Sequence, residues 1–191
     1  MTQAVETTRE WHGLTIPTPG TFAIDPAHSR AGFVARHLMV SKVRGAFTEV
    51  TGEVVVAEDP AQSAVAADIT AASIDTGVAD RDNHLRSPDF LAVEEYPALR
   101  FRSTGLRWGD GGDFVLTGEL TIRDVTRAVA LEVAYEGVAR SPWGQEVIGF
   151  TASTEIDREE FGITWNQALE TGGVLVGKQV KIEISVEAIR Q

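Results

Sequence analysis

The densest group of side chains that could do chemistry lies in residues 80–91, where charged residues and one histidine alternate with leucine and phenylalanine. Arg81, His84 and Arg86 carry donors that could hold an anionic or polar group of a ligand, and arginine matches phosphate through paired hydrogen bonds. The same residues also suit structural roles. His84 could hydrogen-bond to its neighbours, and Arg86 could form an ion pair with Asp89 on one helical turn. Both interpretations stay open.

Metal and catalytic chemistry find little support. His28, His37 and His84 could together bind zinc or iron. Asp25 or Asp89 could add an oxygen ligand, but the histidine spacing creates no local site. The acidic residues around Arg158 are typical of a solvated face or of ion pairs. The chain has no cysteine, no Gly-x-Ser-x-Gly motif and no glycine-rich phosphate loop. We therefore expect no metal, no cofactor and no catalytic residue.

Composition restricts the partners. The 17 Lys and Arg residues are outnumbered by 28 Asp and Glu, and the net charge of −11 disfavours nucleic acid and anionic membrane surfaces. No apolar run reaches the roughly 18 residues that a membrane span requires, so we expect no membrane insertion. Residues 1–10 lack the basic and apolar regions of a secretory signal, which predicts a cytoplasmic location.

The elements that must position these residues are strands. Residues 1–20 are polar and broken by glycine and proline, and we interpret them as an N-terminal extension. From residue 21 to 191, apolar residues alternate with polar ones at the period of half-buried strands, in one domain. About eight such runs joined by short turns predict an all-β fold, an antiparallel up-and-down barrel that closes its own edges. One short helical segment is expected near 80–91, with Leu85, Phe90 and Leu91 bracing one barrel end.

The side chains predicted to face the lumen mix large and small residues. A barrel of about eight strands either fills itself with side chains or holds one slender ligand. Aliphatic walls would specify an apolar guest, whereas interdigitating side chains would leave no cavity. The predicted lumen residues are Phe33, Ala35, Ile69, Phe101, Phe114, Leu116, Leu131, Val133, Tyr135, Phe150, Ile182 and Ile184.

Several motifs together resemble the YceI-like family, a lipocalin-like group associated with polyisoprenoid binding. The strongest is Asp82-Asn83-His84-Leu85-Arg86-Ser87-Pro88-Asp89-Phe90-Leu91, followed by Tyr96-Pro97. The others are Asp25-Pro26-Ala27-His28-Ser29, residues 33–37, 43–47 and 118–126, and Ile156-Asp157-Arg158-Glu159-Glu160-Phe161-Gly162. The resemblance covers about residues 21–189. It implies an extended lipocalin-like barrel whose lumen takes a polyisoprenoid, an isoprenoid quinone or a fatty-acid-like chain.

Such a ligand needs a mouth. We predict that Arg81, His84, Arg86 and Trp165 line it and contact a head group such as a diphosphate or a quinone carbonyl. The segment 161–177 would then be either a lid or a cap packed over the barrel end. The family, and the aromatic turn at Trp143, lead us to expect a homodimer.

The favoured function is a soluble protein that binds and transports, or sequesters, one long apolar chain. The alternative is a structural or stress-response interaction protein with a filled barrel. An enzyme acting on a lipid is the least favoured hypothesis, because such an enzyme would need polar catalytic groups deep in the tunnel.

Overall fold

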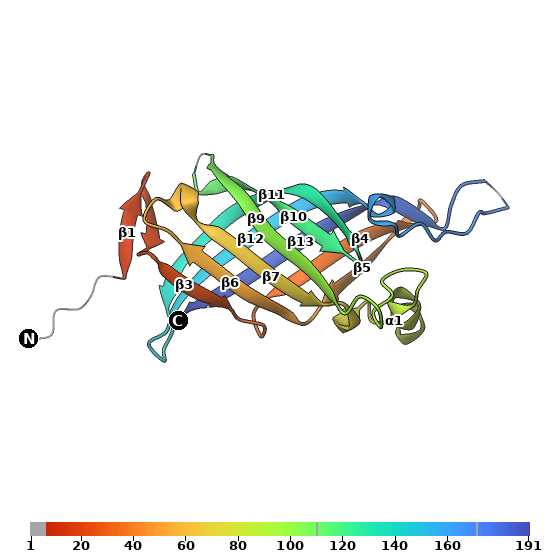
Figure 1. The fold of residues 1–191 in the computed structure, drawn as a ribbon, viewed down its shortest axis with the longest axis horizontal. Coiled ribbons are helices and arrows are strands. Elements are labelled where there is room, and N and C mark those ends of the chain that lie inside the picture. Colours follow the sequence, from red (N-terminus) through yellow and green to blue (C-terminus); the bar gives the residue numbers. More distant parts are fainter. Residues whose placement is uncertain (1–6, 110, 171) are drawn as a thin grey trace, which may run out of the picture.

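The structure is a computed structural model, and it describes residues 7–109, 111–170 and 172–191. In this part of the chain, antiparallel strands form the wall of a closed barrel (Figure 1). Eight strands follow one another around the wall, and the last pairs with the first. They are β3 (Gly20–Ile24), β6 (Val50–Val56), β7 (Ala64–Thr70), β9 (Ala98–Trp108), β10 (Asp113–Ile122), β11 (Val125–Arg140), β12 (Glu146–Asp157) and β13 (Val176–Arg190). The predicted all-β barrel is confirmed.

The wall divides at one place, along β13. The end of β13 pairs with β3, whereas its residues 176–185 pair with β4 (Arg30–His37). The strand β4 forms a hairpin with β5 (Ser41–Phe47), and β5 pairs with the short β8 (Ile74–Asp75). In the sequence this hairpin lies between β3 and β6, although these two strands pair with each other in the wall. The fold is therefore an up-and-down barrel from which one hairpin branches at β13.

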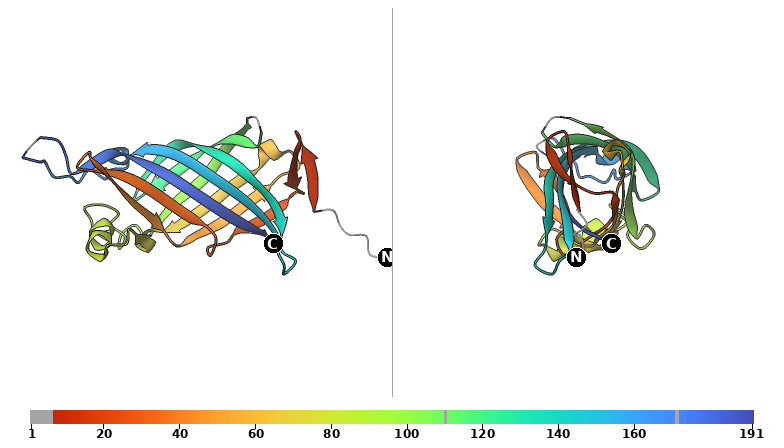
Figure 2. Two further views of the ribbon diagram at one scale, coloured as in Figure 1. Left: turned by 180° about the vertical axis from the view of Figure 1, so that it is seen from behind. Right: turned by 90° about the vertical axis from the view of Figure 1, so that its left-hand side faces the viewer.

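Separate elements lie at the two ends of the barrel (Figures 1 and 2). At one end lies a small hairpin of β1 (Thr8–Trp11) and β2 (Leu14–Pro17), within the segment predicted as an extension. At the other end lies the helix α1 (Ala79–Arg86). Three short 3₁₀ helices complete the fold: η1 (Pro60–Gln62), η2 (Ala71–Ser73) and η3 (Arg158–Phe161). No helix in the described ranges is long and apolar enough to cross a membrane.

The helix is shorter than the predicted 80–91 because of Pro88. A residue that precedes proline avoids the helical region, and Ser87 is extended with ψ of 169°. The chain then turns back, and Phe90 and Leu91 are buried against the barrel. The predicted bracing of one end by Leu85, Phe90 and Leu91 is therefore confirmed.

Two glycines make room for aromatic rings inside the barrel. A Cβ atom at Gly45 would lie 2.5 Å from the ring of Phe33, and one at Gly118 would lie 2.4 Å from the ring of Phe101. Real Cβ atoms do not approach other atoms so closely, so each ring lies across the bare backbone of the neighbouring strand. The large residue and the glycine together set how far the ring extends into the lumen.

Candidate functional site

The barrel encloses a cavity of about 310 Å³, near the lower end of the range for ligand pockets. It is elongated, because residues from both barrel ends line it: Ile16 and Pro17 from the small hairpin, and Leu85 and Phe90 from the α1 end. Most of the lining side chains are aliphatic or aromatic. Such a space suits a slender apolar chain better than a polar molecule.

The structure places all twelve predicted lumen residues on the wall of this cavity. They face inward because alternate residues of a strand point to opposite faces. The two-residue period did not reveal the lining contributed by turns and end elements, such as Ile16, Pro60 and Ile163. Their signal is weaker, since a single apolar residue in a loop has no period to mark it.

None of the four predicted mouth residues lines the cavity. Arg86 donates to the carbonyl oxygens of Ala72 (2.9 Å) and Ile74 (2.7 Å), and Arg81 donates to the hydroxyl and the carbonyl of Thr76. The predicted ion pair between Arg86 and Asp89 is wrong, because the helix ends before Asp89. In these contacts both arginines fasten α1 to the segment between β7 and α1.

His84 and Trp165 belong to an aromatic cluster at the α1 end. His84 Nε2 lies 2.9 Å from Asp89 Oδ2, and its ring meets Phe90 and Trp165 edge-on, at centroid distances of 5.1 and 4.7 Å. Phe90 and Trp165 lie 5.3 Å apart. The cluster joins the segment after α1 to residues 161–165, which pack over the barrel end as a cap. Residues 167–170 and 172–175 instead project beyond the barrel end (Figure 1).

Arg158 holds that cap in place. Its side chain is buried, and burial lowers the pKa of its guanidinium. The Nε atom donates to Gly177 (3.0 Å), Nη1 donates to Ile163 (2.7 Å) and Trp165 (2.9 Å), and Nη2 donates to Val176 (3.4 Å), all at backbone carbonyls. The acidic residues around Arg158 match both interpretations offered for them, because Glu160 is exposed and Glu159 forms an ion pair with Lys178 at 2.6 Å. Arg158 itself is buried and lines the cavity, with its hydrogen-bonding capacity directed to the backbone.

A model of the YceI-like domain matches residues 22–188 of this sequence. The chain belongs to the YceI-like family. A UPF0312 protein of Staphylococcus epidermidis is 40% identical over 171 residues, which are 87% of this chain and 95% of the relative. The family predicted from the motifs is therefore confirmed.

Solved structures show the same fold. BcnA of Burkholderia cenocepacia aligns with a TM-score of 0.73 at 23% identity, over 86% of this chain and 98% of BcnA. A domain of Saccharophagus degradans described as polyisoprenoid binding aligns with a TM-score of 0.68 at 12% identity, over 91% of this chain and all of that domain. At these identities the likeness concerns the fold.

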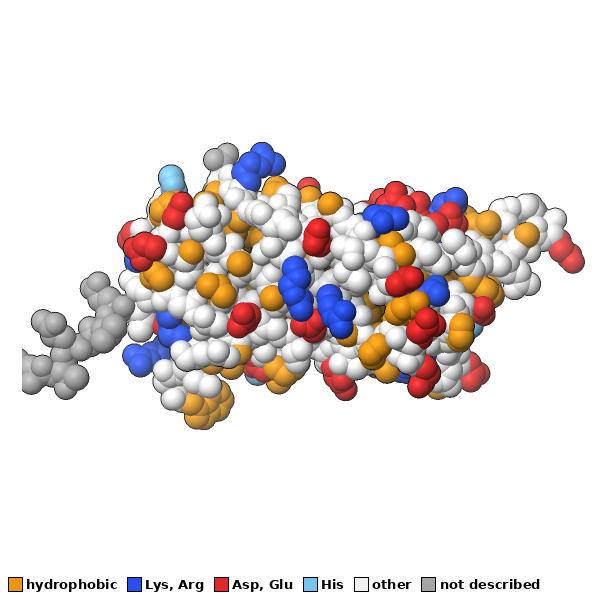
Figure 3. Space-filling view, viewed as in Figure 1, with side chains coloured by type: hydrophobic (Ala, Val, Ile, Leu, Met, Phe, Trp, Pro, Cys, Tyr) orange, Lys and Arg blue, Asp and Glu red, His pale blue; other side chains and the backbone are white. Residues whose placement is uncertain are grey.

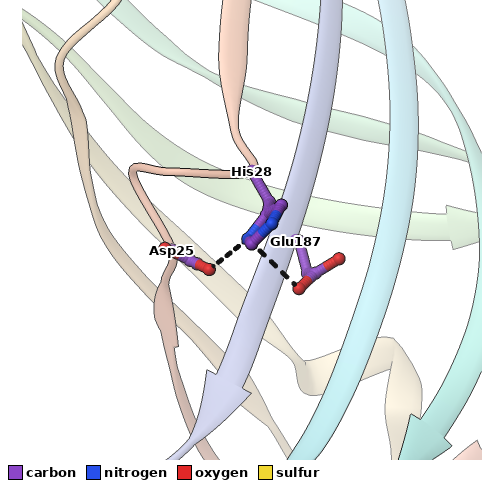
Figure 4. Close-up of side chains that lie close together, drawn as sticks. All are labelled: Asp25, His28 and Glu187. Carbon is purple, nitrogen blue, oxygen red and sulfur yellow. Dashed lines mark hydrogen bonds and ion pairs between the residues drawn. The ribbon is translucent and has the colours of Figure 1, made fainter. Parts of the chain in front are cut away.

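The YceI-like barrel carries one further polar cluster, where β3 gives way to β4. Asp25 Oδ2 lies 2.6 Å from His28 Nδ1, which lies 3.7 Å from Glu187 Oε1 on β13 (Figure 4). The backbone of Glu187 exchanges hydrogen bonds with the Ser29 hydroxyl and accepts one from the Asp25 N–H. The motif at 25–29 therefore replaces the missing strand pairing where the wall divides.

Among the described residues, the His, Asp and Glu side chains of this cluster lie close enough together to share a cation. It includes His28 but neither His37 nor His84, so the three histidines are not gathered into the single site considered from the sequence. His84 is instead paired with Asp89 at the α1 end.

The Asp25–His28 pair should make the stability of the YceI-like barrel depend on pH. The hydrogen bond to Asp25, then the charge of Glu187, raise the pKa of His28 above its ordinary 6.5, and the same bond lowers the pKa of Asp25. The histidine contribution is complete below its unfolded pKa and is lost as pH rises through its folded pKa. The aspartate contribution is lost only as pH falls through its own lowered pKa.

We therefore expect His28→Ala to reduce the Tm more at about pH 5.5 than at about pH 9, measured by circular dichroism melts. The Asp25→Asn variant should show the same pattern, because it removes the main partner of the imidazolium. Equal Tm losses at both pH values would contradict this assignment.

Proposed function

We propose that this protein binds one long apolar chain, such as a polyisoprenoid, an isoprenoid quinone or a fatty-acid-like lipid, inside the barrel, and transports or sequesters it. The observation that carries the proposal is the elongated cavity of about 310 Å³ with its aliphatic and aromatic lining. The presence of this cavity argues against the alternative hypothesis, a structural or stress-response protein whose barrel is filled by side chains. Each buried methylene favours binding by about 0.8 kcal/mol, so a long chain gains affinity without any polar contact.

The lining also indicates that the lumen holds only the apolar chain of the ligand and not its head group. Arg158 is a charged residue on the cavity wall, and its donors are directed to carbonyls of the cap. A diphosphate or other charged head group would have no comparable partner in the lumen, and its desolvation would be costly. We therefore place any head group outside the cavity. We no longer assign it to Arg81, His84 and Arg86, because their polar groups already bond to residues 72–76 and to Asp89.

The test is to extract protein purified without detergent with organic solvent, and to analyse the extract by mass spectrometry against a mock purification. We expect a long-chain species in stoichiometric amount. An empty extract would be challenged by adding octaprenyl and fatty-acyl probes to the protein. Failure of every probe to bind, with a native mass equal to the bare chain, would contradict the proposal.

Three expectations accompany this function: no catalytic activity, a cytoplasmic location and a homodimer. The exposed Trp143, 85% accessible in the turn between β11 and β12, supports a contact surface at that turn. Sedimentation of the wild type and of Trp143→Ser would test the dimer, since the variant should shift the protein to the monomer mass.

A further inference from the structure

Three large apolar residues form the tip of the β4–β5 hairpin and point into solvent. Leu38, Met39 and Val40 are 38%, 54% and 81% exposed, and they are half of the large hydrophobic residues that are exposed among the described ones. Water-facing turns usually carry glycine, asparagine or aspartate. Adjacent exposed apolar residues of this kind are typical of a surface that contacts a membrane or another protein.

The backbone conformation of the tip is also energetically unfavourable for the residues that adopt it. Leu38 and Met39 have φ of 53° and 60°, in the left-handed region where residues with a Cβ atom are disfavoured. The turn is fixed by the bond from Val40 N–H to the His37 carbonyl, and by the Leu38 N–H, which donates to the Leu175 carbonyl at 2.8 Å. The apolar residues are therefore displayed in a defined conformation.

Basic residues stand directly behind the tip. Arg36 and Lys42 are cross-strand partners on the outer face, and both are exposed. Like charges at opposed positions repel each other. Neither of the two is within ion-pair distance of a carboxylate in the described part of the chain, in contrast to Arg44, which meets Glu183 at 3.4 Å. Phosphate oxygens lying against the hairpin would relieve this repulsion.

We propose that the β4–β5 tip docks the protein on the surface of a phospholipid bilayer. Leu38, Met39 and Val40 enter the head-group region, and Arg36 and Lys42 contact lipid phosphates. This inference concerns where an apolar ligand would be exchanged, and it rests on the proposed function for its purpose but not for its evidence. It revises, for this tip alone, the expectation that the net charge of −11 keeps the protein from anionic surfaces.

The hairpin tip lies at the same end of the barrel as α1 and projects beside the segment that precedes β13 (Figures 1 and 2). On the face shown in Figure 3, acidic side chains also gather at this end. Lipid phosphates repel these carboxylates. The bilayer would thus meet only the tip itself, where Arg36 and Lys42 stand behind the apolar residues.

The test is co-sedimentation of the full chain with vesicles of phosphatidylcholine, with and without phosphatidylglycerol. Met39→Asp should weaken binding about tenfold or more, because an apolar contact is replaced by a charge. Arg36→Gln and Lys42→Gln should each weaken it about fivefold, and added salt should remove that difference. The matched control is Val55→Asp, which places the same charge at an exposed valine of the barrel wall, 37% accessible.

The outcomes separate this inference from the proposed function. A wild type that does not bind vesicles, or a Met39→Asp variant that binds like the wild type, would overturn the docking site. A Met39→Asp variant that changes the oligomeric mass and leaves vesicle binding intact would assign the tip to a second copy of the chain, which also overturns it. Solvent extraction of the same samples reports separately on the lumen, since Met39→Asp should leave the lipid content unchanged.

Discussion

Replacing Ala152 with tryptophan is expected to abolish the binding of long-chain lipid and to leave the fold intact. Ala152 lines the cavity between Val133 and Ile184 on the neighbouring strands. A tryptophan side chain would displace about four methylenes of the ligand. At about 0.8 kcal/mol each, affinity should fall about a hundredfold or more. Titration with a fluorescent polyisoprenoid, together with mass spectrometry of the purified protein, would measure the loss.

The matched control is Ala130→Trp, which introduces the same side chain on the outer face of β11. Ala130 is exposed, and its neighbours Val129 and Leu131 line the cavity. Its lipid content should equal that of the wild type. Phe101→Asp provides a second test, because a carboxylate facing the lumen should also abolish retention. A folded Ala152→Trp or Phe101→Asp variant that keeps its lipid would show that the chain does not lie in the lumen.

The second large effect is expected at Arg158. Replacement by methionine keeps much of the side chain's bulk and leaves the carbonyls of Ile163, Trp165 and Gly177 without their donor. Each buried carbonyl left without a partner costs about 1–3 kcal/mol, so we expect a total loss of about 3–5 kcal/mol. For a domain of this size the corresponding decrease in Tm is about 10 °C. Thermal melts and urea titrations would measure it.

Two variants show whether this effect comes from the guanidinium geometry. Arg158→Lys keeps the charge, but a single ammonium cannot reach all of these carbonyls, so its loss should be intermediate. Arg127→Met changes an exposed arginine whose donor meets only the adjacent Thr126 carbonyl, and it should alter stability by less than about 0.5 kcal/mol. An Arg158→Met variant as stable as Arg127→Met would show that the bonds from Arg158 to the backbone carbonyls do not hold the cap in place.

The barrel and its lumen were predictable because one period determines both. The strand that carries Phe33 and Ala35 alternates regularly, so the same reading that finds a strand also finds its inward face. The four mouth residues were not predictable in this way. Which atom Arg81 or Arg86 contacts depends on where the chain turns after Ser87, and no period encodes that turn.

Contacts between distant segments were the least predictable. Glu187 completes the cluster of Asp25 and His28 only because the end of β13 passes the break between β3 and β4. Arg158 looked like a surface residue because acidic residues flank it, yet its side chain turns under the segment that follows. Each of these roles depends on closure of the barrel, which is a property of the whole chain.

The placement of separate elements at the two ends of the cavity has a consequence for how affinity varies with ligand length. Within the lumen, every added carbon buries more apolar surface, so affinity should rise by about 0.8 kcal/mol per methylene. The rise should stop once the chain reaches from Leu85 and Phe90 to Ile16 and Pro17, because further carbons lie outside the apolar lining and bury no more surface there. Plotted against carbon number, binding should therefore climb and then break at one length, and the barrel acts as a ruler.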